Sequence, residues 1–297
     1  QSALLHPFVE FVHGDIRDQK SVLSLFQEHN IEAVVHLAAL SHVDNSFGNS
    51  IAFTDTNVTG THVLLETAMQ VWAASNKEMQ SFLFLHISTD EVYGSCEKTA
   101  HQEHLSLLQP TNPYSATKAA AEMLAGAYRC SYKLPVVISR LNNVYGPRQY
   151  PEKVIPKFIL RLKHGLLPRL QGSGKQKRTF LYCTDAARAL LMLFQNADVG
   201  QVYNVGTNDE ISVVDLATKL TTALAPQRLA QGASFDCDED RPFNDQRYYI
   251  DASRIEKEIG WTKKVSFEEG LQKTIDWYVS DNISSHWAIL PPDLFNE

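Results

Sequence analysis

Residues 82–94, FLFLHISTDEVYG, decide the fold, because an apolar run there changes abruptly to a polar one. The apolar part, Phe82–Ile87, is typical of a strand buried on both faces of a parallel sheet. In open α/β sheets ligands bind beyond the carboxyl ends of the strands, which is where the polar part begins. The adjacent carboxyls of Asp90 and Glu91 can act there as proton donor and proton acceptor if their environments separate their pKa values. A solvated turn is the alternative interpretation of these two acids.

The surrounding chain alternates between apolar strand signals and amphipathic helix signals. Around the strand at 82–87 we expect strands at 8–12, 33–37 and 135–140, with helices at 18–29, 50–74 and 113–132. This alternation predicts a doubly wound parallel (Rossmann-like) α/β sheet with right-handed crossovers. After residue 147 the pattern is mixed α/β, with helices expected at 154–164, 185–195 (capped by Thr184), 213–223 and 267–279, and strands at 178–182 and 203–206.

The change of pattern predicts two domains. Residues 1–141 and 179–205 are expected to form the Rossmann-like domain, and residues 142–178 and 206–297 a smaller mixed α/β domain. Residues 41–44 are expected to be a loop. The small residues Ala38 and Ala39 before it would let a flat ligand approach the backbone, or would allow close helix packing.

The composition argues against several classes of function. The formal net charge is −7, and the charges are scattered along the 297 residues, so we expect no nucleic-acid partner. No apolar run reaches membrane-spanning length, and the first residues show no secretory signal. The four cysteines and eleven histidines show no metal-ligand spacing, so we expect no metal and a cytoplasmic protein with reduced thiols.

The segment NPYSATK at 112–118 places Tyr114 and Lys118 four residues apart on an expected helix. A lysine ammonium near a phenol favours the phenolate and would lower the pKa of Tyr114. The phenolate could then accept a proton from a substrate hydroxyl while hydride leaves the same carbon. The bare spacing is weak evidence, and taken alone it favours an ordinary surface pair. The hydroxyls of Ser88 and Thr89 at a strand end favour the catalytic interpretation, because they could orient a substrate.

Two further groups of residues suit a nucleotide-sugar ligand. The guanidinium groups of Arg178 and Arg241 match diphosphate, although they could also be surface ions. Asn142 and Asn143 follow an expected strand, where amides could bind sugar hydroxyls or a nicotinamide amide, or could form a turn.

The order of the motifs resembles that of the nucleotide-sugar dehydratases of the extended short-chain dehydrogenase/reductase family, and above all the dTDP-glucose 4,6-dehydratases of animals. The resemblance runs from about residue 11 to residue 278. It is carried by GDI (14–16), HLAA (36–39), SHVD (41–44), TNVTGT (56–61), HISTDEVYG (86–94), NPYSATK (112–118), NNVYGP (142–147), PEKVIP (151–156), GSGKQKR (172–178), YNVGTN (203–208), DRPFNDQRY (240–248) and GW (260–261).

The resemblance implies an internal redox cycle with bound NAD. Tyr114, with Lys118 and Thr89, would take the C4 hydroxyl proton of a dTDP-glucose or UDP-glucose substrate during hydride transfer. Glu91 would then remove the C5 proton, and Asp90 would protonate the departing C6 hydroxyl. Epimerases of the same fold typically lack this Asp–Glu pair, and sugar-acid decarboxylases typically keep only the Glu, so the pair favours dehydration to a 4-keto-6-deoxy sugar nucleotide.

The resemblance also implies the binding residues and the assembly. The first domain would bind NAD through Asp15, Ile16, Leu37, Ala38, Ala39, Ser41, Thr56, Tyr114, Lys118 and Asn143. The sugar nucleotide would be bound, mainly by the second domain, through Ser41, Thr89, Asn142, Lys153, Val154, Arg178, Asn208, Asp240, Arg241 and Asn244. The expected partner is a second copy of the chain, in a homodimer that pairs the helices containing Asn57 and Tyr114 as four helices.

The sequence departs from the family pattern in three places. Leu40 stands where bacterial members usually have Glu, and Phe243-Asn244 where they have Gly-His. The chain contains no G-x-x-G-x-x-G turn and begins just before the third strand of such a domain. We therefore expect either an N-terminally truncated sequence of an active dehydratase, or a non-catalytic relative that acts by sugar-nucleotide binding or dimerisation. The chain as given is expected to bind NAD poorly, because a helix N-terminus normally holds the pyrophosphate.

Overall fold

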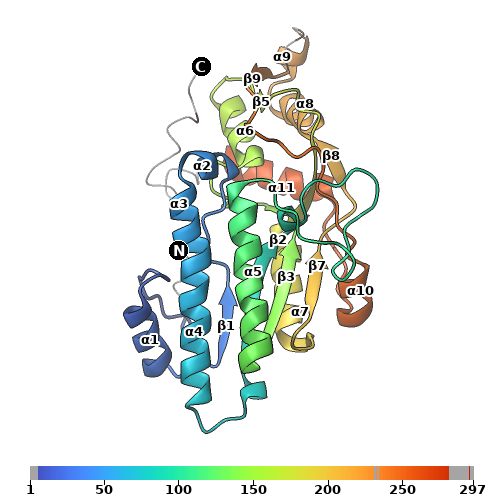
Figure 1. The fold of residues 1–297 in the computed structure, drawn as a ribbon. Helices are drawn as coiled ribbons and strands as arrows, with labels where there is room; N and C mark the ends of the chain where they lie inside the picture. Colours follow the sequence, from blue (N-terminus) through green and yellow to red (C-terminus); the bar gives the residue numbers. More distant parts are fainter. Residues whose placement is uncertain (1–5, 231, 233, 281–293, 295–297) are drawn as a thin grey trace.

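The main sheet consists of four strands in the order β1–β2–β3–β7, and all neighbouring strands are parallel, which confirms the predicted parallel sheet (Figure 1). The structure is a computed structural model that describes residues 6–230, 232, 234–280 and 294. The register aligns His36 with His86 and Ser88 with Arg140, so the carboxyl ends of the strands lie side by side. The strands are β1 (Ala33–His36), β2 (Leu83–Thr89), β3 (Val136–Leu141) and β7 (Val202–Val205).

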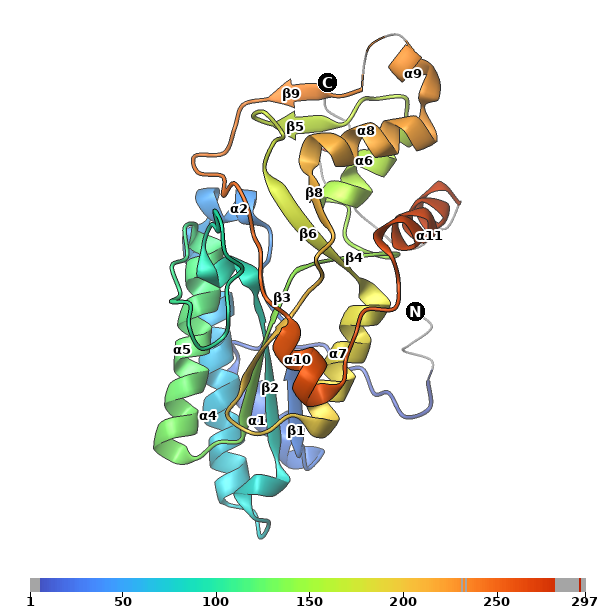
Figure 2. The same ribbon diagram turned by 90° about the vertical axis from the view of Figure 1, so that its right-hand side faces the viewer.

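Helices cover both faces of this sheet, which gives three layers (Figures 1 and 2). Successive side chains of β2 lie on opposite faces of the sheet. Phe84 packs with Leu65 and Trp72 of α4, whereas Leu85 packs with Trp261 near α10. Fully burying such side chains stabilises the fold by about 1.5–3 kcal/mol each. One face carries α1 (Gln19–Glu28), α4 (Gly60–Ala73) and α5 (Pro113–Tyr132), and the other carries α7 (Cys183–Asn196) and α10 (Ser253–Ile259).

Helix α5 begins and ends where its sequence specifies. Asn112 is the N-cap, since its side chain accepts a 2.9 Å hydrogen bond from the Ser115 amide, and Pro113 supplies the first helical position. Lys133 then ends the helix in the left-handed conformation, with φ of 60°. The helix expected at 50–74 is present as α3 (Ser50–Phe53), a π-helical turn η2 (Thr54–Thr59) and α4.

A second, smaller unit lies beyond the carboxyl ends of the main strands (Figure 2). Its core unites Ile159 of α6, Leu216 of α8 and Ile275 of α11. The predicted boundary between residues 178 and 179 falls within its strand β6. Its sheet has the order β4–β6–β8, and β5 pairs with β9. The elements are β4 (Asn143–Tyr145), α6 (Val154–Lys163), β5 (Arg169–Gln171), β6 (Lys177–Tyr182), β8 (Glu210–Ser212), α8 (Val213–Leu224), α9 (Pro226–Ala230), β9 (Asp236–Asp238) and α11 (Phe267–Val279).

Three sequence-based expectations about local structure are wrong. Residues 8–12 form no ladder with any strand that the structure describes, and Phe8 is 91% exposed. An apolar run becomes a strand only when a neighbouring strand takes up its backbone hydrogen bonds. The expected loop at 41–44 runs into helix α2 (Val43–Gly48), and Thr184 lies inside α7, whose N-cap is Tyr182.

Candidate functional site

The two acids follow directly from the end of β2. The chain turns there into the 3₁₀ helix η4 (Asp90–Tyr93), because the Thr89 hydroxyl accepts a hydrogen bond from the Glu91 amide at 3.3 Å. Asp90 is 1% exposed and Glu91 8% exposed. The structure therefore excludes the solvated turn that the sequence left open.

Asp90 lies in surroundings that favour its neutral form. Burial, and next to it the charge of Glu91, raises the pKa of Asp90 to about 7. Two groups oppose this shift by donating to the carboxylate: Asn142 Nδ2 at 2.7 Å and Thr89 Oγ1 at 3.2 Å. Near neutral pH, Asp90 can consequently hold a proton and also release it.

Glu91 faces positive charge and two polar side chains. Burial raises its pKa, but the charges of Arg178 and Lys153 act in the opposite direction. Asn112 Nδ2 lies 3.4 Å from Glu91 Oε2, and the Tyr248 hydroxyl lies 3.3 Å from the same oxygen. The two carboxyls therefore differ in environment, as a donor and an acceptor of protons require.

Tyr114 and Lys118 both lie on the buried face of α5, beside the end of β2. Lys118 Nζ donates to the Ile87 carbonyl at 2.7 Å, and burial lowers the pKa of Lys118 to about 8. Burial and the charge of Glu91 raise the pKa of Tyr114, while a hydrogen bond with Thr89 opposes the rise. The predicted lowering of the Tyr114 pKa is thus wrong for the ligand-free chain, because desolvation and the charge of Glu91 outweigh the hydrogen bond with Thr89.

Asn57, in the π-helical turn, joins the loop after β1 to helix α5. Its side-chain oxygen accepts from the Leu40 amide at 2.8 Å. Its Nδ2 lies 3.0 Å from the Leu40 carbonyl and 2.9 Å from Thr117 Oγ1, next to Lys118. This buried amide therefore sets the position of the segment that contains Ala38, Ala39 and Leu40.

The cationic residues predicted for the sugar nucleotide lie on the second unit and face the carboxylates. Arg178 is 7% exposed; it donates to the Asp245 carbonyl at 2.9 Å and to Asn244 Oδ1 at 3.2 Å. Its guanidinium lies 4.4 Å from the centre of the Tyr248 ring. Lys153 Nζ donates to the Ser41 carbonyl at 2.6 Å, which connects the two units across the site.

The other predicted substrate residues lie around Arg178 and Lys153, further from the carboxylates. Arg241 pairs with Asp44 of α2, and Asp240 accepts from Asn244 Nδ2 at 2.9 Å. Asn208 is set further out, since it is exposed and contacts the Tyr249 hydroxyl at 3.4 Å. Val154 begins α6 directly after Lys153. The structure thus brings most of the predicted set together between the end of β2 and the second unit, and leaves Asn208 at the margin of that region.

The residues predicted for the dinucleotide form a less buried region along the same edge of the sheet. Leu37 is 59% exposed at the end of β1, and Ala38 beside it is also exposed. Thr56 lies in η2 and Asn143 in β4, both half-buried. Among the described side chains, Ser88 Oγ is buried without a hydrogen-bond partner. An apolar floor with spare polar groups fits a flat cofactor with an amide and hydroxyls.

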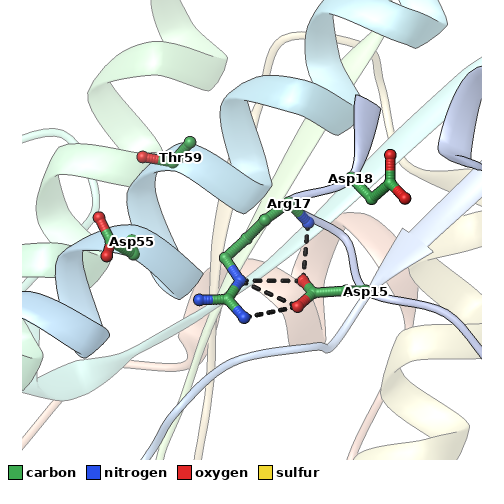
Figure 3. Close-up of a pocket in the computed structure, with 5 residues that line it drawn as sticks. All are labelled: Asp15, Arg17, Asp18, Asp55 and Thr59. Atoms are coloured by element: carbon green, nitrogen blue, oxygen red, sulfur yellow. Dashed lines mark hydrogen bonds and ion pairs between the residues drawn. The ribbon is translucent and has the colours of Figure 1, made fainter. Parts of the chain in front are cut away.

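A cavity of about 380 Å³ lies at the far end of this region, next to Asp15 (Figure 3). Arg17 donates to the Asp15 carboxylate through Nε at 3.0 Å and Nη2 at 2.6 Å, and these bonds lower the pKa of Asp15 to about 2. Ile16 packs on Gly60, where a Cβ would lie 2.5 Å from Ile16 Cδ1. The remaining lining residues are Asp18, Asp55 and Thr59.

Several residues of the site were missed from the sequence. The sequence predicts that Asn112 opens a helix, but its contact with Glu91 depends on how that helix, α5, packs. Tyr248 lies within the motif DRPFNDQRY, which was the available signal, and its hydroxyl also lies 2.6 Å from Asp245 Oδ2. Within the described part of the chain, no cluster of His, Cys, Asp and Glu suits a metal ion, and no helix has the length and apolar character to cross a bilayer.

Comparisons with known proteins agree with this geometry. The family model described as GDP-mannose 4,6 dehydratase matches residues 2–274. A trifunctional UDP-glucose 4,6-dehydratase/UDP-4-keto-6-deoxy-D-glucose 3,5-epimerase/UDP-4-keto-L-rhamnose-reductase of Arabidopsis thaliana is 46% identical over 93% of this chain, which spans 40% of that protein's length. The dTDP-D-glucose 4,6-dehydratase of Homo sapiens is 45% identical over 91% of this chain and 75% of its own length.

A solved structure gives the same picture. It is the dTDP-glucose 4,6-dehydratase of Streptomyces venezuelae with NAD and TYD bound, which superposes with a TM-score of 0.85 at 36% identity. The match covers 95% of this chain and 84% of that one.

Proposed function

The chain belongs to the family described as GDP-mannose 4,6 dehydratase, and we propose that it dehydrates a nucleoside-diphosphate glucose to the 4-keto-6-deoxy sugar nucleotide, with NAD as cofactor. The observation that carries the proposal is the buried pair Asp90 and Glu91, whose surroundings differ as acid and base require. The substrate is dTDP-glucose or UDP-glucose, since similar relatives are named for each.

The first task of the site is to remove the proton of the sugar C4 hydroxyl. Tyr114, which is a phenol in the ligand-free chain, is the base in its phenolate form, which the positive charges of Lys118 and of bound NAD⁺ would favour. Thr89 is placed to share the hydrogen bond, because its hydroxyl already interacts with the phenol. Lys118 adds a positive charge beside the developing phenolate. Bound NAD⁺ would supply the hydride acceptor for C4 and, once reduced, the hydride donor for C6.

The second task is elimination of water from C5 and C6. The C4 ketone acidifies the C5 proton, which Glu91 accepts, and the electron pair forms the C5–C6 double bond. Asp90 gives its proton to the C6 hydroxyl, so the C6–O bond breaks and water leaves. When hydride is returned to C6, Glu91 gives a proton back to C5. Asn142 holds Asp90 in place throughout through its 2.7 Å hydrogen bond.

The predicted binding residues support the same function. The diphosphate would be met by Arg178, Arg241 and Lys153, and the sugar hydroxyls by Thr89 and Asn142, where the end of β2 meets the second unit. The dinucleotide would lie from Asp15 along the ends of the strands to Tyr114, as predicted. The described residues that would hold it are Asp15, Ile16, Leu37, Ala38, Ala39, Ser41, Thr56, Tyr114, Lys118 and Asn143.

We further propose a homodimer through α4 and α5 of each copy, four helices in all. Met123 of α5 is 65% exposed and Tyr132 is 51% exposed, which supports a partner on this face. The division into a cofactor domain and a substrate domain, and the cytoplasmic location, stay predictions.

The test uses the purified chain with NAD⁺, and dTDP-glucose or UDP-glucose in separate reactions. We expect a product that has lost one water by mass spectrometry and that carries solvent deuterium at C5 when the reaction is run in heavy water. The preferred nucleotide is the one with the higher kcat/KM. Binding of a sugar nucleotide without any product would contradict this proposal and favour the non-catalytic alternative.

A further inference from the structure

We propose that Arg140, Glu122 and Tyr93 form a buried positioning network. It fixes the residues of α5 that act in C4 oxidation, Tyr114 and Lys118, relative to the acid–base pair of η4, Asp90 and Glu91. The inference rests on the proposed function, because it concerns how the two halves of that reaction are kept in register. None of the three residues touches the reacting groups. Each is almost fully buried, at 6%, 4% and 1% exposure respectively.

The contacts of Arg140 define the network. Its Nε lies 3.1 Å from both carboxylate oxygens of Glu122, and its Nη2 donates to Glu122 Oε2 at 2.6 Å. Its Nη1 donates to the Tyr93 hydroxyl at 2.6 Å. The guanidinium carbon also lies 4.7 Å from the centre of the Tyr93 ring. One side chain thereby holds a carboxylate and a phenol in a fixed relative position.

The positions of the three residues in the chain give the network its importance. Glu122 is one helical turn beyond Lys118 on α5, and Tyr93 is the last residue of η4, which contains Asp90 and Glu91. Arg140 lies on β3, where it is paired with Ser88 of β2. The network consequently joins the element of the proton acceptor for C4 to the element of the elimination residues.

Tyr93 is held from further directions. Its hydroxyl donates to Asn204 Oδ1 of β7 at 2.9 Å, and its ring stacks on His101 at 4.9 Å with 7° between the planes. Asn204 Nδ2 in turn donates to the His101 carbonyl at 3.0 Å. With its hydroxyl bonded to Arg140 and Asn204 and its ring stacked on His101, Tyr93 has little freedom to move, and neither does the short turn that precedes it.

A buried ion pair of this kind contributes orientation more than net stability. Removing both charges from water costs about as much as their attraction returns, so apolar side chains would serve stability as well. Catalysis, in contrast, depends strongly on position, and a displacement of about 1 Å can reduce a rate by about a hundredfold. The network is therefore expected to act on elimination, which needs Asp90 and Glu91 to be placed correctly against a sugar held by Tyr114.

The test is Tyr93→Phe, which keeps the ring contacts and removes both hydrogen bonds of the hydroxyl. We expect kcat to fall roughly 10- to 100-fold with KM changed less than about threefold. Because C4 oxidation does not use η4, the enzyme should accumulate NADH during turnover, visible by its absorbance. Tyr203→Phe is the matched control, since Tyr203 is a buried tyrosine of β7 whose hydroxyl contacts Glu258.

A second variant and a second measurement separate this inference from the proposed function. Glu122→Gln should produce the same NADH accumulation, and combining it with Tyr93→Phe should add little, because both break one coupling. In the ligand-free protein, amide hydrogen exchange of residues 88–94 should rise in Tyr93→Phe and stay unchanged in Tyr203→Phe, whether or not the chain turns over. Unchanged exchange, or an equal loss of oxidation and elimination, would overturn the inference.

Discussion

The carboxylate site at the end of β2 and the cavity beside Asp15 differ in how their polar groups are held. Asp90 is bound by Asn142, 52 positions away, and Glu91 by Tyr248, 157 positions away. Asp15 is bound by Arg17, two positions away, and Asp18 by Ser21, three positions away. The first arrangement exists only in the folded chain, whereas the second is made by neighbours that are close in any conformation.

Burial adds to this difference. In the low dielectric around Asp90 and Glu91, a single neighbouring charge or amide changes the protonation state strongly. Around Asp15, water and salt screen the same interactions. Substitutions in the first region should therefore have large effects on catalysis and stability, and substitutions in the second should have small, local ones.

The largest effect is expected for Glu91→Gln. The amide is nearly isosteric but cannot accept the C5 proton, so kcat should fall about 10²–10⁴-fold. Solvent deuterium should no longer enter C5, while binding of the sugar nucleotide measured by calorimetry stays close to that of the parent. Water elimination at the parent rate would rule out Glu91 as the base. It would also contradict the expectation that substitutions in the buried site have larger effects than those beside Asp15.

A smaller effect, on stability, is expected for Asp90→Asn. The pKa of Asp90 is about 7 in the folded chain, against about 3.9 when unfolded, so between these values the folded state binds an extra proton. The free energy of unfolding of the parent should therefore fall as pH rises through this range. The variant escapes this loss and should be more stable by about 2–4 kcal/mol above pH 7, with the difference vanishing near pH 4.

Urea denaturation of both proteins across this pH range measures the difference. A gain that is independent of pH would mean that packing, and not the buried charge, limits stability at this position. The expected gain in stability comes with a loss of turnover, because Asn cannot protonate the leaving hydroxyl.

The smallest effect is expected for Asp15→Asn, in the exposed region. The variant loses charge-assisted bonds that solvent already weakens, so Tm should not change measurably. NAD affinity should weaken less than about tenfold, since one hydrogen bond to the cofactor is affected. Titration of the ligand-free protein with NAD⁺ measures this. A loss of NAD affinity as large as the loss of kcat expected for Glu91→Gln would show that the position of each side chain matters as much in the exposed region as in the buried one.

Much of the fold could be predicted from local patterns. Helix α11 spans Phe267–Val279, as expected from its apolar spacing, and the four parallel strands follow from buried runs separated by amphipathic helices. Residues 8–12 show the limit of this approach, because their apolar run carries no information about whether a neighbouring strand pairs with it. The π-helical turn at 54–59 likewise leaves no signal in helical spacing.

The sequence by itself determined which chemical groups gather at the site, because strands of one parallel sheet end along a common edge and residues four apart share a helix face. The tertiary structure decided their protonation. The pKa of Asp90 lies near neutral pH, Tyr114 is a phenol in the ligand-free chain, and Lys118 is bound to a backbone carbonyl. These properties arise from desolvation and from partners distant in the chain, such as Asn142 and Arg178, and desolvation is a property of the packed interior.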